Sequence, residues 1–251
     1  MPHIEGKRYA VVSCHVERPL DDACWSRFAD VQARRPGGFR IAALIRPPDE
    51  EAGEDSGRWI ERARQAAARG PLGQHTHFVS PQHARPSCAG PEHAGRVRRE
   101  AGWIRASGLA PTLFCAGGWY MDADLAEALA GLGYADCTAT SFRPSYLAPT
   151  MPRIGAGEPT WLVLGSGARL LELPTTHSLG MAARAVLRPG LDEPVVHVYF
   201  HDTDLLSVRR RLALVAALEL LGRRRLPSDL DALQQRVARD REVDFRTVSN
   251  M

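Results

Sequence analysis

Short apolar runs alternate with helix-forming stretches along most of this chain, and this order constrains the fold more than any other feature. Seven runs are typical of buried strands, at residues 9–14, 39–45, 72–75, 112–115, 135–140, 169–173 and 195–200. Helical stretches lie at residues 22–35, 57–69, 92–107, 122–132, 205–221 and 228–239. Consecutive parallel strands need a crossover, which is usually a helix. The order therefore predicts one α/β barrel-like domain.

The bulk composition is that of an ordinary globular protein and argues against two specialised classes. Hydrophobic residues make up 44% of the 251 residues and charged residues 24%. The net charge is only +3, with the basic residues spread beside Asp and Glu, so nucleic acid is not an expected partner. No stretch reaches the ~18 apolar residues that a membrane span needs.

Two arginine triplets, at residues 209–211 and 223–225, flank the helical run 212–221. We interpret them as the solvated face and the C-terminal charge of a helix. Contact with phosphate or with a membrane surface is the alternative, so peripheral membrane contact stays open.

Cysteine usage and the N-terminus predict a cytoplasmic protein. The five cysteines form no CxxC pair, and an odd number in a chain of this length indicates reduced thiols. The first five residues, Met-Pro-His-Ile-Glu, lack the basic-then-apolar layout of a signal peptide.

Polar side chains gather at the predicted strand ends, where the chemistry of a barrel is found. Glu17 follows the first strand, and alternation along the third strand places His75 and His77 on one side of the backbone. Further polar residues at strand ends are His15, Cys115, Asp136, His201 and Asp202. Imidazole is a common metal ligand, and a mononuclear site needs about three protein ligands. The pattern therefore predicts a metal site.

The chain resembles the polysaccharide deacetylase (NodB-homology, carbohydrate-esterase-type) superfamily over roughly residues 9–206. Its first motif pairs two acids after strand one; here Glu17 matches the metal carboxylate and His15 occupies the position of the base. His75-Thr76 matches the start of the His-Ser/Thr-X-X-His motif, but the fourth position holds Val79. The second histidine ligand is then His77 or, across an insertion, His83.

Later motifs extend the resemblance. The stretch 114–119 matches the small-residue turn of the third motif, with Cys115 where the family has arginine, and 199–202 matches the late-strand histidine. The blocks 134–137, 142–144 and 173–175 are similar to those of the lipid-linked formamido-arabinose deformylases.

The resemblance implies a distorted (β/α) barrel of about seven strands. A single domain would span residues 1–251, with a core at about 9–206 and C-terminal helices at 206–239. It also implies one divalent ion, most often zinc, bound by Glu17, His75 and His77, with His83 as the substitute ligand.

Catalytic roles follow for two histidines. His201 would protonate the leaving amine, oriented by Asp202 or Asp204. His15 is a general base, a further ligand, or a sign of lost chemistry. Candidate substrate contacts are Gly117, Gly118, Trp119, Tyr120, Asp136, Arg143 and His177.

The expected activity is removal of an N-acetyl or N-formyl group from a small or lipid-linked amino sugar. The alternative is a degenerate barrel that binds sugar or metal without hydrolysis, because His15 and Cys115 replace family residues.

Overall fold

The computed structural model describes most of the chain: residues 8–49, 51–145, 150–187, 191, 193–237 and 241–249. The termini of the predicted domain, at 1–7 and 250–251, lie outside the described residues, as do 238 and 239 of the last predicted helix.

The elements alternate as the sequence predicts. The strands are β1 (Tyr9–Val16), β2 (Ala42–Ile45), β3 (Leu72–Thr76), β4 (Leu113–Ala116), β5 (Ala135–Asp136), β6 (Thr160–Val163), β7 (Arg169–Glu172), β8 (His177–Ser178), β9 (Val195–His201), β10 (Leu226–Pro227) and β11 (Glu242–Asp244). The α-helices are α1 (Asp22–Arg34), α2 (Ser56–Ala67), α3 (Glu92–Ala106), α4 (Ala123–Leu132), α5 (Leu179–Ala185), α6 (Val208–Arg224), α7 (Leu230–Gln234) and α8 (Phe245–Val248). Short 3₁₀ helices are η1 (Pro36–Gly38), η2 (Gly117–Trp119) and η3 (Asp202–Leu206).

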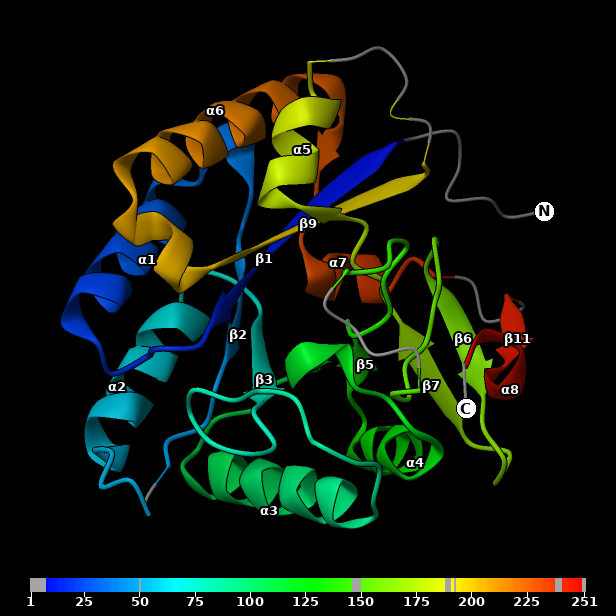
Figure 1. The fold of residues 1–251 in the computed structure, drawn as a ribbon. Coiled ribbons are helices and arrows are strands. Elements are labelled where there is room, and N and C mark those ends of the chain that lie inside the picture. Colours follow the sequence, from blue (N-terminus) through cyan, green and yellow to red (C-terminus); the bar gives the residue numbers. More distant parts are fainter. Residues whose placement is uncertain are drawn as a thin grey trace.

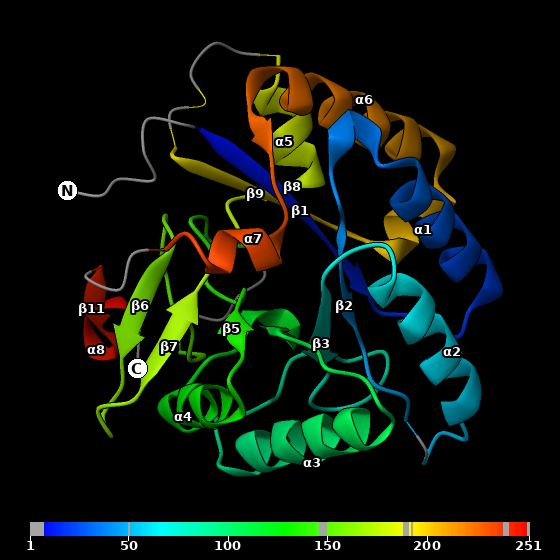
Figure 2. The ribbon, with the colours of Figure 1, turned by 180° about the vertical axis from the view of Figure 1, so that it is seen from behind.

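The strands form one mainly parallel sheet in the order β11-β6-β7-β5-β4-β3-β2-β1-β9-β8. Only β6 and β7 pair in antiparallel fashion among the described strands. Helices α1 to α6 form an outer layer around the strands (Figures 1 and 2). The predicted single-domain α/β fold with a parallel sheet is confirmed.

The segment after β7 closes the sheet into a distorted barrel. Thr175 donates its backbone N–H to the carbonyl of Ala139, just after β5, at 2.8 Å. The next residue, Thr176, donates to the carbonyl of His197 on β9 at 3.0 Å. One short stretch therefore bridges the two flanks of the sheet and brings its distant strands together.

Alternation along the strands sorts side chains between the outer helices and the barrel interior. On β1, Val12 and Cys14 belong to the apolar cluster that includes residues of α1, α2 and α6. Tyr9 and Val11 belong to the interior cluster, which α7 closes at one end. His15 lies on the same side of β1 as Tyr9 and Val11, because alternate side chains of a strand point to the same face. A polar residue at the end of β1 is thus directed to the barrel mouth.

Several predicted boundaries differ from the structure; the strand expected at 135–140 ends at Asp136, and the strand expected at 39–45 begins at Ala42. The stretch 144–167, expected to be irregular, contains β6, which pairs antiparallel to β7 and only partly buries its side chains. The helix expected at 205–221 is interrupted because Ser207 caps the N-terminus of α6, accepting from the backbone N–H of Arg210. The helix expected at 228–239 is short, ending at Gln234. No helix in the described ranges combines the length and hydropathy needed to cross a bilayer.

A buried carboxyl pair joins β5 to β7. Asp136 and Glu172 are register partners, and both side chains are fully buried. Thr138 donates to Asp136 at 2.6 Å, and the Ala139 backbone N–H donates to Glu172 at 3.1 Å. Burial raises the pKa of Asp136 to about 6 and raises the pKa of Glu172 well above its ordinary value. Adjacent carboxyl groups in this setting cannot both ionise readily.

This pair predicts a loss of stability at alkaline pH. The pKa of each carboxyl group is higher in the folded protein than in the unfolded chain. The protonated pair therefore stabilises the fold fully below the unfolded-state pKa of about 4, and this stabilisation is lost as the pH rises through the folded-state pKa values. Glu172→Gln removes one ionising group and the repulsion on Asp136. We expect the fall in unfolding free energy from pH 5 to pH 8 to shrink by on the order of 1–2 kcal/mol. Denaturant titration checks this, with the exposed Glu219→Gln as control; parallel profiles for all three proteins would contradict it.

Candidate metal centre

A cavity of about 310 Å³ opens at the C-terminal ends of the barrel strands. Its walls are formed by His15, Glu17, His75, Ala84, Arg85, Ala116, Gly118, Trp119 and His201. Several of the polar residues singled out at strand ends therefore meet in one place. Parallel strands bring their carboxyl ends to one edge, which explains the convergence.

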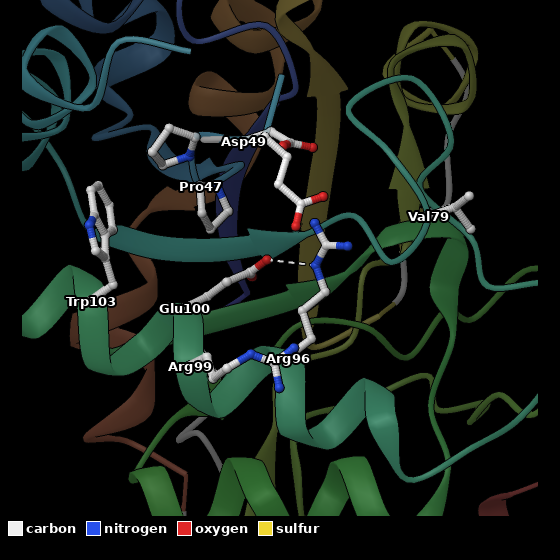
Figure 3. Close-up of a pocket in the computed structure, with 9 residues that line it drawn as sticks. Pro47, Asp49, Val79, Arg96, Arg99, Glu100 and Trp103 are labelled. Atoms are coloured by element: carbon white, nitrogen blue, oxygen red, sulfur yellow. Dashed lines mark hydrogen bonds and ion pairs between the residues drawn. The ribbon is translucent and has the colours of Figure 1, made fainter. Parts of the chain in front are cut away.

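A second cavity, of about 380 Å³, lies outside the barrel between the loop after β2 and helix α3. Figure 3 shows Trp103 at one side of it and the ion pair between Arg96 and Glu100 at its floor. No residue predicted as part of the site lines this second cavity. The candidate metal ligands and catalytic residues are therefore found at the barrel mouth and not at this second cavity.

His75 and His77 each present one ring nitrogen without a hydrogen-bond partner. The backbone carbonyl of Cys115 lies 2.9 Å from Nδ1 of His75, and that of Pro81 lies 2.9 Å from Nδ1 of His77. A carbonyl only accepts, so each Nδ1 carries the proton and each Nε2 keeps its lone pair. Both Nε2 atoms are buried and unpartnered among the described residues. This is the arrangement of metal-binding imidazoles.

Glu17 completes a set of three ligands with these histidines. Its Oε1 lies 3.8 Å from Nε2 of His77, and the ligand atoms of Glu17, His75 and His77 lie within 4.8 Å of one another. Burial lowers the pKa of His75 well below its ordinary value and also lowers the pKa of His77. The rings are therefore neutral and able to coordinate near pH 7. Two imidazoles and one carboxylate fit a divalent ion of the zinc type.

The backbone that carries Glu17 is held from two sides. Nε of Arg46 donates to the Glu17 carbonyl at 2.8 Å, and Glu54 binds the same guanidinium at 2.6 and 2.9 Å. The backbone N–H of Arg18 donates to Oδ2 of Asp202 at 2.8 Å. Fixed partners of this kind orient a metal ligand.

His201 lies on the other side of Glu17, with Nε2 at 3.6 Å from Oε1. Asp204 is 3.8 Å from its Nδ1 and accepts from its backbone N–H at 3.0 Å. Burial would lower the pKa of His201, but Asp204 and Glu17 outweigh it, so the pKa is raised. Asp204, the alternative to Asp202, is thus the carboxylate beside the ring. Asp202 binds backbone amides instead, and burial raises its pKa to about 6.

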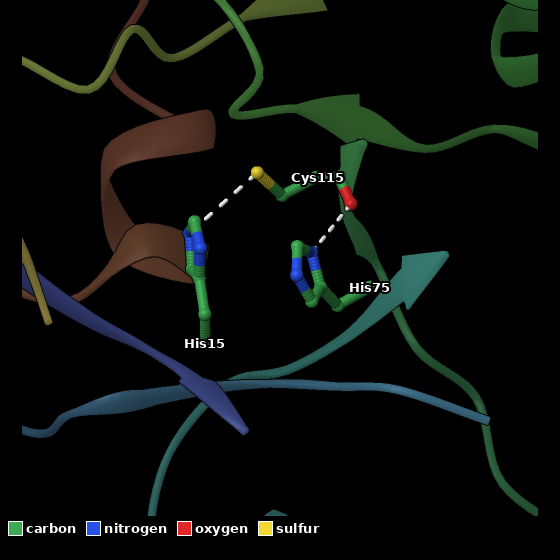
Figure 4. A group of neighbouring side chains, drawn as sticks. All are labelled: His15, His75 and Cys115. Carbon is green, nitrogen blue, oxygen red and sulfur yellow. Dashed lines mark hydrogen bonds between the residues drawn. The ribbon is translucent and has the colours of Figure 1, made fainter. Parts of the chain in front are cut away.

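His15 lies beside Cys115, deeper in the barrel. Its Nε2 is 3.6 Å from Sγ of Cys115, and its ring centroid is 4.6 Å from that of His75 (Figure 4). Burial lowers the pKa of His15 well below its ordinary value and raises the pKa of Cys115 well above its own. Both side chains are uncharged near pH 7. His15 can therefore accept a proton or bind an ion.

Trp119 encloses the cavity through an uncommon backbone conformation. Gly118 and Trp119 have φ of 63° and 61°, a left-handed pair that is rare for a bulky residue. The turn brings the indole to 5.4 Å from the His15 ring and 5.0 Å from the Tyr199 ring. Such strain occurs at functional sites. The predicted turn 117–119 therefore contributes Trp119 and Gly118 to the cavity wall.

Other predicted residues lie away from the cavity. Gly117 is buried against Ala84 and Thr76, while Tyr120 is buried and donates to Asp122. Asp136 is in the β5–β7 pair described above. Arg143 is exposed. His177 is buried, and its Nδ1 lies 2.9 Å from the hydroxyl oxygen of Thr176.

His83 also lies apart from the cavity, because a tight turn holds it at the surface. Its backbone pairs with Ser80, and its ring nitrogen lies 3.1 Å from the Ser80 hydroxyl. It belongs to neither group of potential ligands found among the described residues.

We predict that His77 and not His83 is the second histidine ligand. His77→Ala should lower metal affinity by at least about tenfold, because loss even of a residue that supports a ligand costs 10–100-fold. His83→Ala should retain wild-type affinity. Competition with a chromophoric chelator measures both; equal losses would require a three-histidine site.

Arg85 shapes the site although nothing in its spacing marked it. Arg85 comes from the loop after β3, lines the cavity and donates to the Gly118 carbonyl at 2.7 Å. It brings a guanidinium to the wall of the cavity. The sequence did not predict this role, because Arg85 reaches the cavity only when the loop after β3 folds back over the strand ends.

Solved structures with similar folds include one deacetylase, one candidate deacetylase and one pseudoenzyme. A protein from Mycobacterium smegmatis, described as a candidate polysaccharide deacetylase, aligns with a TM-score of 0.69 at 15% identity, over 96% of this chain and 94% of that one. The Bc1960 peptidoglycan N-acetylglucosamine deacetylase aligns at 0.55 and 12%, over 95% and 92%. The fold is that of the polysaccharide deacetylases.

The pseudoenzyme with a similar fold is BA3943 from Bacillus anthracis, of carbohydrate esterase family 4. It aligns with a TM-score of 0.54 at 9% identity, over 91% of this chain and 66% of that one. No protein-family model and no curated protein matches the sequence. The deacetylase fold thus exists with and without activity.

Proposed function

We propose that this protein is a metal-dependent hydrolase that removes an N-acetyl or N-formyl group from an amino sugar. The observation that carries the proposal is the pair of unpartnered Nε2 atoms of His75 and His77 facing Glu17 at the mouth of a deacetylase-like barrel. A bound divalent ion would lower the pKa of a water molecule and polarise the amide carbonyl.

The remaining residues supply proton transfer. His15 is neutral, faces the cavity and accepts the proton that the attacking water loses. His201 has a raised pKa, so it carries a proton to higher pH than an ordinary histidine and donates it to the leaving nitrogen. Asp204 orients the His201 ring. The two histidines are thus set apart by their environments, one as acceptor and one as donor.

The walls of the cavity favour a sugar substrate. Trp119 offers an aromatic face, and Arg85 offers a cation at the rim. Beyond His201 an adjoining recess of about 390 Å³ is lined by apolar residues of α5, β9 and α6 together with Arg210 and Asp204. The motif similarity to formamido-arabinose deformylases supports a formyl sugar, small or lipid-linked, and zinc as the ion.

A non-catalytic barrel is the second candidate. The pseudoenzyme with this fold supports it, as does His15 at the position of the family's base. The two candidates differ in turnover and agree in metal binding.

Metal analysis of the purified protein, followed by an assay of acetate and formate release, tests the proposal. The substrates are N-acetyl and N-formyl amino sugars, each free, nucleotide-linked and lipid-linked. We expect release that stops on chelation and returns with the added ion. A metal-loaded protein that releases neither acid from the whole panel would establish the non-catalytic alternative.

A further inference from the structure

The described residues contain a second set of ligands that shares His75 with the first. One ring nitrogen of His15, one ring nitrogen of His75 and Sγ of Cys115 all lie within 4.8 Å of one another, and all three side chains are buried. Figure 4 shows His15 and His75 turned toward each other with the Cys115 sulfur between β4 and the His15 ring.

The fold produces this set through strand register. His75 and Cys115 are direct partners on β3 and β4, and His15 is the last but one residue of β1, on the same inner face. Sγ of Cys115 is 3.6 Å from Nε2 of His15. Zn–N and Zn–S bonds at a tetrahedral angle require about 3.6 Å between such atoms. This pair already has the spacing of two ligands on one ion.

We propose that the site holds its ion in either of two positions: an outer one formed by Glu17, His75 and His77, and an inner one formed by His15, His75 and Cys115. The two positions exclude each other because the Nδ1 of His75 is committed to the Cys115 carbonyl, leaving one nitrogen to share. Nε2 of His75, which is buried and unpartnered among the described residues, is the nitrogen left to bind an ion in either position.

The donor atoms decide which ion takes which position. With an ion bound and the Cys115 thiol deprotonated, each set would supply two neutral imidazoles and one anionic ligand, so only the anionic atom would differ. Sulfur favours soft ions such as Cd²⁺, and oxygen favours harder ones such as Mn²⁺. On binding, the S–H bond of Cys115 breaks, the sulfur donates the electron pair to the ion, and the proton passes to the buffer. No oxidation state changes.

The inner position would be inactive, a consequence that rests on the proposed function. It takes up the lone pair of His15, the proposed proton acceptor, and withdraws the ion from Glu17. Soft ions should therefore bind well and support little turnover, whereas hard ions should support turnover from the outer position.

Cobalt substitution tests the inner position directly. One equivalent of Co²⁺ added to metal-free protein should give the intense near-ultraviolet band of sulfur-to-cobalt charge transfer. Cys115→Ser should abolish the band, and Cys137→Ser, at another buried cysteine of the barrel interior, should keep it. Glu17→Gln should also keep it, because Glu17 is absent from the inner set. The affinity for Cd²⁺ should fall by at least about tenfold in Cys115→Ser.

Two results would overturn the proposal. One is bound Co²⁺ in the wild-type protein with weak visible bands but no charge-transfer band. The other is a band that survives in Cys115→Ser or disappears in Glu17→Gln. If Cys115→Ser fails to fold by circular dichroism, the wild-type and Glu17→Gln spectra still decide. Hydrolysis by a protein that shows no charge-transfer band would refute the inner position alone. A charge-transfer band in a protein that hydrolyses no substrate, whichever ion is bound, would refute the proposed function alone.

Discussion

His75→Ala should reduce bound metal from about one ion per chain to near zero and abolish hydrolysis. His75 is the residue common to both sets of ligands, so its loss removes a ligand from each position. The change should leave the fold intact, because the ring lies at the end of β3 and faces the cavity. Elemental analysis after gel filtration measures the stoichiometry, and far-ultraviolet circular dichroism checks the fold.

His83→Ala is the matched control, since it removes an imidazole eight residues away that is exposed and belongs to neither set. It should keep its metal and its activity. A His75→Ala protein with full metal content would refute the site assignment, and equal metal loss in the control would place the ion in the loop after β3.

His201→Ala should lower turnover by about 10²–10⁴-fold, the usual contribution of a positioned general acid. Its metal content should not change, because His201 is in neither set of ligands. The acid function fails as pH rises through the pKa of the group, and the raised pKa of His201 extends activity to higher pH. Steady-state kinetics from pH 5 to pH 9 measure both effects.

Two comparisons make this prediction specific to proton donation. An acyl substrate with a better leaving group needs no proton, so His201→Ala should impair its hydrolysis much less. Asp204→Asn should lower the pKa of His201 and move the alkaline limb of the pH profile to lower pH. Loss of metal in His201→Ala, or nearly full turnover on the amide, would remove His201 from the mechanism.

Much of the site could be anticipated from local sequence because a strand fixes side-chain direction by simple alternation. As predicted, His75 and His77 lie on one side, with ring centroids 4.9 Å apart. Glu17 comes beside His77 because β1 and β3 end at one edge. The choice between Asp202 and Asp204 could not be made, because it depends on the turn η3. There Asp202 binds the β1 loop and Asp204 contacts His201.

The sequence by itself determined the order of the main strands and helices, but not β6 or α5, and it determined the residues at the strand ends, because periodicity and capping act over a few residues. Only the tertiary structure decided which ends meet. The pairing of β1 with β9 sets His15 opposite His201, residues far apart in the chain. The loop after β3 carries Arg85 to the cavity, and the β3–β4 register presents Cys115 to His15. These contacts arise from long-range packing, which no local pattern encodes.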